Sequence, residues 1–328
     1  MSRLRVGVVG TGFIAGRHLA ALTASPDVAV VAVADPVRER AEAAAARCGA
    51  RAHGDGLALL GTEELDAVWL CVPPFAHGPL EAAAVARGLP FFVEKPLALD
   101  LATAEAVAAE VARTGLPTAV GYHWRHLGVV QRAAETVPAG EVQLVTGSWL
   151  DRTPAPPWWV QRGGSGGQVV EQTTHVLDLA RLLAGEVDLV SAAERPAGAD
   201  GEVPTAAVAL LHFASGAVGS ISSTRVLGWR HAVGLQVVTE GRVVELSERS
   251  LTDHSLRVVT ADGEEVSRSD EDPVAAEDRE FVDVLLGRLP RTRVPYEEAL
   301  RSHALACAAD RSAREGTPVR LQVGGSDG

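Results

Sequence analysis

Cysteine is scarce in this sequence: only Cys48, Cys71 and Cys307 occur in 328 residues, far apart and without a CxxC pair. This spacing excludes a disulfide scaffold, argues against a structural zinc site and suits a reducing compartment. Basic residues are also few, since 30 Lys and Arg are outnumbered by 42 Asp and Glu, which gives a formal net charge of −12. A field of this sign repels polyphosphate, so we expect no nucleic-acid or acidic-membrane partner.

Long hydrophobic runs are absent as well. The apolar run near the start is short and broken by glycine, unlike a signal peptide. The uncharged stretch 203–224 is long enough to cross a bilayer. A proline, a histidine and a Ser-Gly pair interrupt it, so we predict two strands around a turn. With 47% hydrophobic and 22% charged residues, we expect a folded, soluble, cytoplasmic protein.

Short apolar runs and helix-forming stretches alternate over the first 120 residues. Unbroken runs rich in Val, Leu and Phe are typical of strands buried on both faces, and the Ala-rich stretches between them favour helices. Alternation of this kind predicts βαβ units and a parallel sheet. The expected strands are 4–9, 28–34, 67–72, 90–93 and 118–121, and the expected helices are 13–24, 37–48, 78–87 and 101–113.

The pattern changes after about residue 122. Strand-like runs separated by Gly- and Asp-containing turns extend from 187 to 266, which predicts one open antiparallel sheet with helices on one face. Further helices are expected at 126–137, 169–183, 274–289 and 296–315. We therefore predict an α/β protein with two domains. Residues 1–121 form a doubly wound parallel sheet, and residues 122–328 form an α/β domain with a large open, mostly antiparallel sheet.

A glycine-rich turn joins the first expected strand to the first expected helix. Gly10 and Gly12 belong to a G-x-G-x-x-A pattern, in which Gly10 allows a tight turn and Gly12 lets backbone N–H groups reach a pyrophosphate. The anion would lie at the N-terminal end of the helix that begins near Phe13 and Ile14. A turn of this pattern that binds nothing is the alternative.

Asp35 ends the second expected strand, about 20 residues further along. A carboxylate at this place accepts hydrogen bonds from the adenosine ribose of NAD and repels the 2′-phosphate of NADP. We therefore expect NAD as the cofactor, although Arg38, one helical turn later, leaves NADP open. Asp35 also suits a helix N-cap because Pro36 follows it, and the two roles can coexist.

Two further clusters follow later strands of the parallel sheet. Pro73, Pro74 and His77 come after the strand at 67–72, and Glu94 and Lys95 come after the strand at 90–93. The carboxyl ends of parallel strands form the edge at which the nicotinamide would lie, so we predict that these residues contact the cofactor. Lys95 would place a charge at its reactive end. A surface lysine paired with Glu94 is the alternative.

These residues together form a recognisable set. The segments that carry it are Gly10-Thr-Gly-Phe-Ile-Ala15, Pro73-Pro74…His77, Glu94-Lys95-Pro96 and the glycine-rich run that leads to His175 and Asp178. Over essentially the whole chain, the sequence resembles the Gfo/Idh/MocA oxidoreductases, the relatives of glucose–fructose oxidoreductase and inositol dehydrogenase. The resemblance implies a Rossmann domain, an α/β domain whose sheet forms homodimers or homotetramers, and NAD(P)-linked hydride transfer at a secondary alcohol.

The resemblance also implies roles for individual residues. Lys95 is similar to the active-site lysine of the family. The family pattern Gly-Gly-x-x-x-Asp-x-Gly-x-His-x-x-Asp corresponds here to residues 166–178, where His175 and Asp178 match. Glu171 replaces the Asp of the pattern, and Thr173 replaces a Gly.

These residue types suit the implied chemistry. A secondary alcohol must lose its hydroxyl proton as the hydride leaves, and His175 could take and return that proton. The Lys95 ammonium would hydrogen-bond the reacting oxygen, so both groups would converge on one carbon. Glu171, four residues before His175, would share a helix face with it and fix its tautomer or contact a substrate hydroxyl. A structural His175, bonded to the backbone or to Asp178, is the alternative.

Candidate substrate contacts also lie on two other segments. His123 and Arg125 follow the last parallel strand, and Trp158 and Trp159 lie in a Pro/Gly-rich segment before the helix of His175. Indole rings pack well on the C–H surfaces of sugars. Hydrophobic packing or an oligomer contact is the alternative role of the tryptophan pair. We expect no metal site.

The sequence thus predicts an NAD(P)-dependent dehydrogenase or ketoreductase for a sugar, cyclitol or related polyol. One alternative is an enzyme of the same fold that uses tightly bound NAD transiently for glycoside elimination or hydrolysis. A non-catalytic nucleotide-sensing regulator is another, although such a sensor needs neither Lys95 nor His175. The residues select neither a particular substrate nor a direction of reaction.

Overall fold

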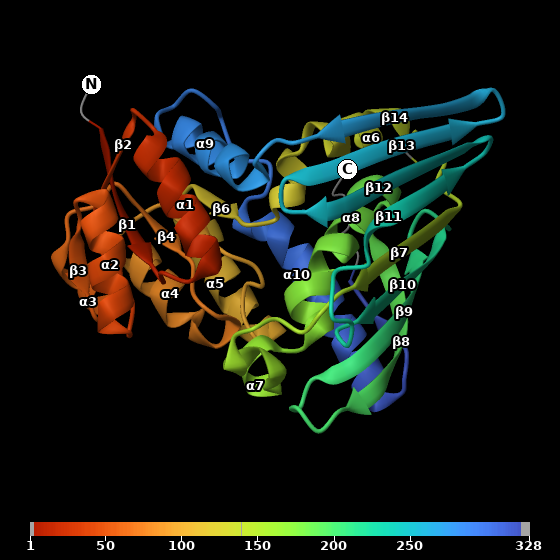
Figure 1. The fold of residues 1–328 in the computed structure, drawn as a ribbon, viewed down its shortest axis with the longest axis horizontal. Helices are drawn as coiled ribbons and strands as arrows, with labels where there is room; N and C mark the ends of the chain where they lie inside the picture. Colours follow the sequence, from red (N-terminus) through yellow and green to blue (C-terminus); the bar gives the residue numbers. More distant parts are fainter. Residues whose placement is uncertain (1–2, 139, 323–328) are drawn as a thin grey trace. The chain divides into compact units, whose positions relative to one another are not determined.

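Residues 3–138 and 140–322 are described by a computed structural model (Figure 1). Contacts divide the chain into two compact units, Met1–His123 with Pro273–Leu300, and Trp124–Asp272 with Arg301–Gly328. The sequence prediction assigns all of 122–328 to one domain, whereas the contacts group Pro273–Leu300 with the N-terminal part of the chain. The domain boundary near residue 121 stays a prediction.

The first unit is built on a six-stranded parallel sheet with the order β3-β2-β1-β4-β5-β6. Its strands are β1 (Leu4–Val9), β2 (Val28–Ala34), β3 (Arg51–His53), β4 (Ala67–Leu70), β5 (Phe91–Val93) and β6 (Thr118–Val120). This confirms the predicted doubly wound sheet. The edge strand β3 was not predicted, because its three residues contain no apolar run that would indicate a buried strand.

Helices cover both faces of this sheet, which explains why its central strands are apolar along their whole length. One face carries α1 (Phe13–Ala24), α2 (Arg38–Cys48) and α9 (Pro273–Leu285). The other carries α3 (Gly56–Thr62), α4 (Pro79–Ala86), α5 (Leu101–Thr114) and the first turn of α10 (Tyr296–Glu315). Helices α1 and α9 lie side by side although more than two hundred residues separate them (Figure 1).

The second unit is built on a nine-stranded sheet with the order β14-β13-β12-β11-β7-β10-β9-β8-β15. Only β7 and β10 pair in parallel among its described strands, so the predicted mostly antiparallel sheet is confirmed. The strands are β7 (Leu144–Leu150), β8 (Val187–Ala197), β9 (Pro204–Phe213), β10 (Val218–Thr224), β11 (Ala232–Thr239), β12 (Arg242–Ser250), β13 (Asp253–Thr260), β14 (Gly263–Ser269) and β15 (Val319–Arg320).

Strands β9 and β10 are the two strands expected within the uncharged stretch 203–224. They pair antiparallel, and buried and more exposed residues alternate along β10 and over residues 208–213 of β9. This alternation is typical of strands with one covered face. In the described part of the chain, no helix is both long and apolar enough to cross a bilayer.

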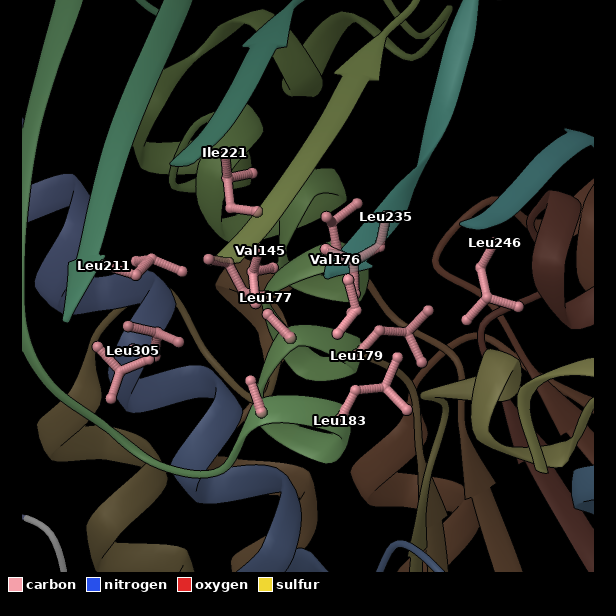
Figure 2. Packing of buried hydrophobic residues seen from close by; sticks show 14 of the residues in the cluster. Val145, Val176, Leu177, Leu179, Leu183, Leu211, Ile221, Leu235, Leu246 and Leu305 are labelled. Atoms are coloured by element: carbon pink, nitrogen blue, oxygen red, sulfur yellow. The ribbon is translucent and has the colours of Figure 1, made fainter. Parts of the chain in front are cut away.

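Helix α8 (Thr174–Ala184) packs on the covered face of the nine-stranded sheet, together with α6 (Gly128–Thr136). Figure 2 shows Val176 on α8 beside Leu235 of β11, with Leu179 on the side toward Leu246 of β12. A Cβ at Gly147 of β7 would lie 2.6 Å from a methyl carbon of Val176, so the glycine allows α8 to approach the sheet closely. This packing fixes the helix that carries His175.

Glu63, just after α3, is a buried carboxylate in the first unit. It accepts hydrogen bonds from Arg51 Nε at 2.7 Å and lies 2.8 Å from His53 Nε2. The hydrogen bond from Arg51, supported by His53 and opposed by burial, lowers the pKa of Glu63 from 4.5 to about 2. Because this pKa is depressed in the folded state, its contribution to stability is complete above pH 4.5 and is lost as the pH falls toward 2.

We expect Glu63→Gln to lower the urea concentration at half-unfolding near pH 6, and the difference from the parent protein to shrink by roughly half near pH 3. Near pH 3 the parent protein loses part of the stabilisation that comes from the Glu63 charge, which the variant lacks at every pH. Urea titrations followed by circular dichroism at both pH values measure this. A difference that stays constant with pH would contradict the assigned role of the Glu63 charge.

Candidate functional site

The glycine-rich turn connects β1 to α1. Gly10 has a φ of 90°, and its N–H donates to the Ala34 carbonyl at 2.8 Å. A Cβ at Gly10 would lie 2.2 Å from the carbonyl oxygen of Cys71, so only glycine fits. A Cβ at Gly12 would meet no atom within 4 Å of the described chain. The backbone around Gly12 is therefore open to a ligand.

Phe13 and Ile14 are the first two residues of α1. Among the described residues, no side chain caps this end of the helix. The Phe13 side chain is 79% exposed, which is unusual for a large apolar residue, and Ile14 is half-buried. The uncapped N–H groups lie at the positive end of the helix dipole, as the predicted pyrophosphate site requires.

Asp35 follows β2 and is buried next to the glycine turn. Its Oδ2 atom accepts hydrogen bonds from the Thr11 N–H at 3.0 Å and the Thr11 hydroxyl at 2.8 Å, and Oδ1 accepts one from the Val37 N–H at 2.9 Å. The N-cap of α2 is Val37, so the expected N-cap role of Asp35 is wrong. A carboxylate has about four acceptor sites, which leaves capacity for a ribose hydroxyl.

Arg38, the residue that left NADP open, begins α2 on the protein surface. Its Nε atom donates to Glu42 Oε1 at 2.7 Å, one helical turn further on. The described contact therefore directs this guanidinium toward a neighbouring carboxylate. This arrangement supports the preference for NAD that Asp35 indicates.

The segment after β4 contains the predicted residues Pro73, Pro74 and His77 around the short helix η1 (Pro74–Ala76). Pro74 and His77 are buried, and Pro73 is half-buried. His77 Nδ1 lies 2.6 Å from Glu81 Oε1. Because a carboxylate only accepts hydrogen bonds, Nδ1 donates to it. Glu81 thereby fixes the orientation of the imidazole ring.

Glu94 and Lys95 follow β5, and the Lys95–Pro96 peptide bond is cis. Glu94 is a buried carboxylate that lies 3.0 Å from His18 Nε2 and accepts a hydrogen bond from the Lys95 N–H at 3.1 Å. A Cβ at Gly121, after β6, would lie 2.7 Å from this carboxylate, so a glycine provides its space. The Glu94 side chain is thus buried in the interior of the first unit, whereas Lys95 is only half-buried.

His175 is buried at the beginning of α8, immediately after the π-helical turn η4 (Val169–Thr173). Its ring centre lies 5.6 Å from that of Trp124 and 5.8 Å from that of Trp149, and it is stacked on Trp149 at 20°. Two indole rings therefore hold the imidazole in one orientation. π-Helical turns occur frequently at functional sites.

The predicted residue Glu171 lies within η4 and is half-buried. Its Oε2 atom accepts a hydrogen bond from Trp159 Nε1 at 2.6 Å. Trp159 is buried in the short helix η3 (Pro157–Val160), and the neighbouring Trp158 is half-buried. In the second unit, the indole of Trp159 therefore orients Glu171 through a hydrogen bond.

The short helix η2 (His123–His126) contains two further predicted substrate contacts, His123 and Arg125, and both are buried. Arg125 donates to Asp178 through Nε at 2.8 Å and Nη2 at 2.7 Å. Asp178 also accepts a hydrogen bond from the Ser302 hydroxyl at 2.5 Å. This bidentate pair joins the segment before α6 to α8. A substrate contact of Arg125 stays a prediction.

Several polar residues around the His175 rings were not predicted. The guanidinium carbon of Arg230 lies 5.4 Å from the Trp149 ring centre, and Arg230 donates to Asp151 at 2.8 Å and pairs with Glu248. Trp124 Nε1 donates to Glu248 at 2.6 Å. Trp149 Nε1 is buried without a hydrogen-bond partner among the described residues. No local pattern in the sequence connects these residues, because they come from distant parts of the chain.

The predicted residues thus gather into two groups, one in each unit. The glycine turn, Asp35, His77 and Lys95 belong to the first unit, and His175 belongs to the second. The convergence of Lys95 and His175 on one substrate carbon stays a prediction.

Comparisons with known proteins match both parts of the chain to one oxidoreductase family. Residues 4–122 match the model described as "Oxidoreductase family, NAD-binding Rossmann fold", and residues 130–244 match the "GFO/IDH/MocA C-terminal domain". The chain is 30% identical to an inositol 2-dehydrogenase of Rhizobium meliloti, over 79% of this chain and 80% of the relative. It is also 30% identical to a levoglucosan dehydrogenase of Pseudarthrobacter phenanthrenivorans, over 76% and 75% of the two chains.

A solved structure has the same fold over nearly its whole length. The crystal structure of GenD2 from gentamicin A biosynthesis in complex with NAD superimposes with a TM-score of 0.86 at 26% identity, and the match covers 98% of this chain and 97% of that one. The order of elements described above is therefore shared with a protein that holds a nicotinamide cofactor.

We expect Gly10→Ala to abolish NAD binding, because its methyl group would overlap the Cys71 carbonyl and the backbone there has a positive φ. Titration calorimetry with NAD measures the loss. Gly16→Ala, on α1 where a Cβ meets open space, is the matched control and should bind NAD as the parent does. Normal NAD affinity in Gly10→Ala would contradict the assigned geometry of the turn.

Proposed function

Because this chain belongs to the Gfo/Idh/MocA oxidoreductase family, we propose that it is an NAD-dependent dehydrogenase that acts on a secondary alcohol of a sugar, cyclitol or related polyol. The single observation that carries the proposal is the turn at Gly10 and Gly12, locked to Asp35 through Thr11 and followed by an uncapped helix end. This arrangement suits a dinucleotide, and the curated relatives act on polyol hydroxyl groups by name.

The first unit holds the cofactor. The N–H groups at the beginning of α1 would bind the pyrophosphate, Asp35 would accept hydrogen bonds from the ribose, and the residues Pro73, Pro74 and Glu94 would line the nicotinamide end. Bound NAD supplies the hydride acceptor for the reaction. The Asp35 carboxylate would repel a 2′-phosphate, so the site favours NAD over NADP.

His175 is the general base for alcohol oxidation and returns the proton in the reverse reaction. The rings of Trp124 and Trp149 hold its imidazole in one orientation and exclude water from its faces. A fixed base loses little entropy when substrate binds, which is part of the advantage of an enzyme over solution. Lys95 donates a hydrogen bond to the reacting oxygen and stabilises its developing negative charge.

Glu171 and Trp149 provide contacts for neighbouring hydroxyl groups. Trp159 occupies one oxygen of Glu171 and thereby directs the carboxylate. The buried N–H of Trp149 is a donor for a hydroxyl or for a bridging water. A ring with several adjacent hydroxyls offers both a donor and an acceptor to such a pair. His123, Arg125 and Trp158 are further candidate contacts.

The working form of the enzyme is a homodimer or homotetramer in the cytoplasm. Val208 and Leu210 are large apolar residues on one side of β9, and both are about half exposed in the single chain. Their side of the nine-stranded sheet is opposite to the covered side, where Ala209 and Leu211 are buried. An exposed apolar face of this kind is typical of a protein interface.

A screen of polyols and keto-sugars with NAD or NADH, followed at the nicotinamide absorbance band, tests the proposed reaction. We expect turnover of at least one cyclitol or pyranose and much weaker turnover with NADP. Cofactor that copurifies and never appears as free NADH would favour the transient use of NAD instead. Binding of NAD without any turnover across the screen would favour a nucleotide-sensing regulator.

On the substrate found, Lys95→Ala and His175→Ala are each expected to lower kcat at least about a hundredfold, the low end for an electrostatic or acid–base group. NAD affinity should be retained in His175→Ala, since that residue lies outside the first unit. The control Arg113→Ala changes an exposed arginine that pairs with Glu110 on α5, away from both groups, and should leave kcat within about twofold. Near-normal kcat in both Lys95→Ala and His175→Ala would contradict the site.

A further inference from the structure

A buried cluster of ionisable groups that includes Glu94 lies next to the turn after β5 that carries Lys95, and the proposed reaction does not account for its other members. His18 on α1 and Asp278 on α9 are both buried. His18 Nδ1 lies 2.8 Å from Asp278 Oδ1, and His18 Nε2 lies 3.0 Å from Glu94 Oε1. One imidazole therefore bridges two carboxylates that come from distant parts of the chain.

The two contacts determine the protonation state of His18. An ionised carboxylate only accepts a hydrogen bond, so with Asp278 and Glu94 both ionised each ring nitrogen carries a hydrogen and the ring is an imidazolium. Burial favours the neutral ring, but the charge of Asp278 and the hydrogen bonds to Asp278 and Glu94 raise the pKa of His18 well above its usual value. The other titratable groups around the ring are Glu277 and the Cys71 thiol, whose pKa burial raises to about 12.

The cluster is anchored at its other end by the core of the sheet. Trp69 Nε1 on β4 donates to Asp278 Oδ1 at 2.7 Å, and the Phe92 ring lies 4.8 Å from the His18 ring. Glu94 in turn accepts a hydrogen bond from the backbone N–H of Lys95. A continuous chain of contacts thus runs from β4 through Asp278 and His18 to Glu94 and the Lys95 backbone.

A metal ion is the competing explanation, because His18, Glu94 and Glu277 offer ligand atoms within 4.8 Å of one another. An imidazole binds a metal through a nitrogen lone pair. Both nitrogens of His18 are directed at carboxylate oxygens at hydrogen-bond distance, so neither is available as a ligand. The geometry is that of a buried cluster in which hydrogen bonds, not a metal ion, join His18 to the two carboxylates.

We propose that His18 and Asp278 are positioning residues, which hold the Glu94 carboxylate and through it the backbone that presents Lys95 to the substrate. The inference rests on the proposed role of Lys95. Removing one partner leaves the others as uncompensated buried charges, so the turn after β5 would shift to relieve them. A displacement of about 1 Å at a catalytic group is enough to lower turnover by about 100-fold.

The decisive variant is Asp278→Asn, which keeps the shape of the side chain and removes its charge. Loss of that charge lowers the pKa of His18, so the ring stays an imidazolium at low pH and becomes neutral as the pH rises. We expect the ratio of its kcat to that of the parent to be close to one near pH 6 and to fall by about tenfold or more toward pH 9. NAD affinity should change little.

His18→Gln cannot titrate, so its kcat ratio should be low and independent of pH. Glu63→Gln is the matched control, because it removes a buried carboxylate that contacts another histidine of the same unit, His53. Its kcat ratio should be near one at every pH. A flat ratio for Asp278→Asn, as a merely structural residue would give, overturns the proposal.

The charge of His18 can be measured directly in the parent protein, which does not depend on any variant folding. Nitrogen-15 NMR of histidine-labelled protein should show His18 with both ring nitrogens still protonated at about pH 7.5, above the usual imidazole pKa. A neutral ring at about pH 7.5 overturns the proposal, as does a stoichiometric divalent metal in the purified protein by elemental analysis.

Lys95→Ala separates this proposal from the proposed function. If Lys95→Ala retains full kcat, the role of Lys95 is wrong and the positioning role falls with it. If Lys95→Ala loses activity while Asp278→Asn matches the parent at every pH, the proposed function stands and only the positioning role is overturned.

Discussion

The first unit depends on covering both faces of its parallel sheet. The strands β4 and β5 are apolar on both sides, and burying only one side would leave large rings such as Trp69 in water. Helix α9 supplies the missing cover. Its Phe281 ring lies 5.3 Å from Trp69 and 6.4 Å from Phe92. The same helix brings Asp278 beside α1. Packing of α9 on the sheet therefore provides the hydrophobic cover and also completes the buried charge cluster.

Much of this fold and of the cofactor site could be predicted from the sequence, because the signals are local. A glycine pattern after an apolar run defines a turn at Gly10, and an acid at the end of the next strand defines Asp35. The length of the apolar runs predicted the parallel sheet, and the spacing of the Gly- and Asp-containing turns predicted the mostly antiparallel sheet. Strand β3 was not predicted because it is short and polar. It lies at the edge of the sheet, and a search for apolar runs does not detect such a strand.

The long-range partners could not be predicted. The pairs His18–Asp278 and Arg125–Asp178 join residues 260 and 53 positions apart, and no periodicity connects them. The sequence contains these residues, but which of them meet depends on which helices pack together in the folded chain. The expected sharing of a helix face by Glu171 and His175 assumed a regular α-helix, whereas a wider π-helical turn intervenes. Glu171 accordingly accepts a hydrogen bond from Trp159.

Cys71 lies at the end of β4, with its carbonyl against Gly10 and its thiol beside the His18 cluster. Thiols react with alkylating agents and peroxides as thiolates, and burial among carboxylates keeps this one protonated at any physiological pH. An ionised thiol next to the glycine turn would be open to attack by such reagents. Here burial, supported by the neighbouring acids, keeps the sulfur in its unreactive thiol form, so inactivation by such reagents would have to begin at another residue.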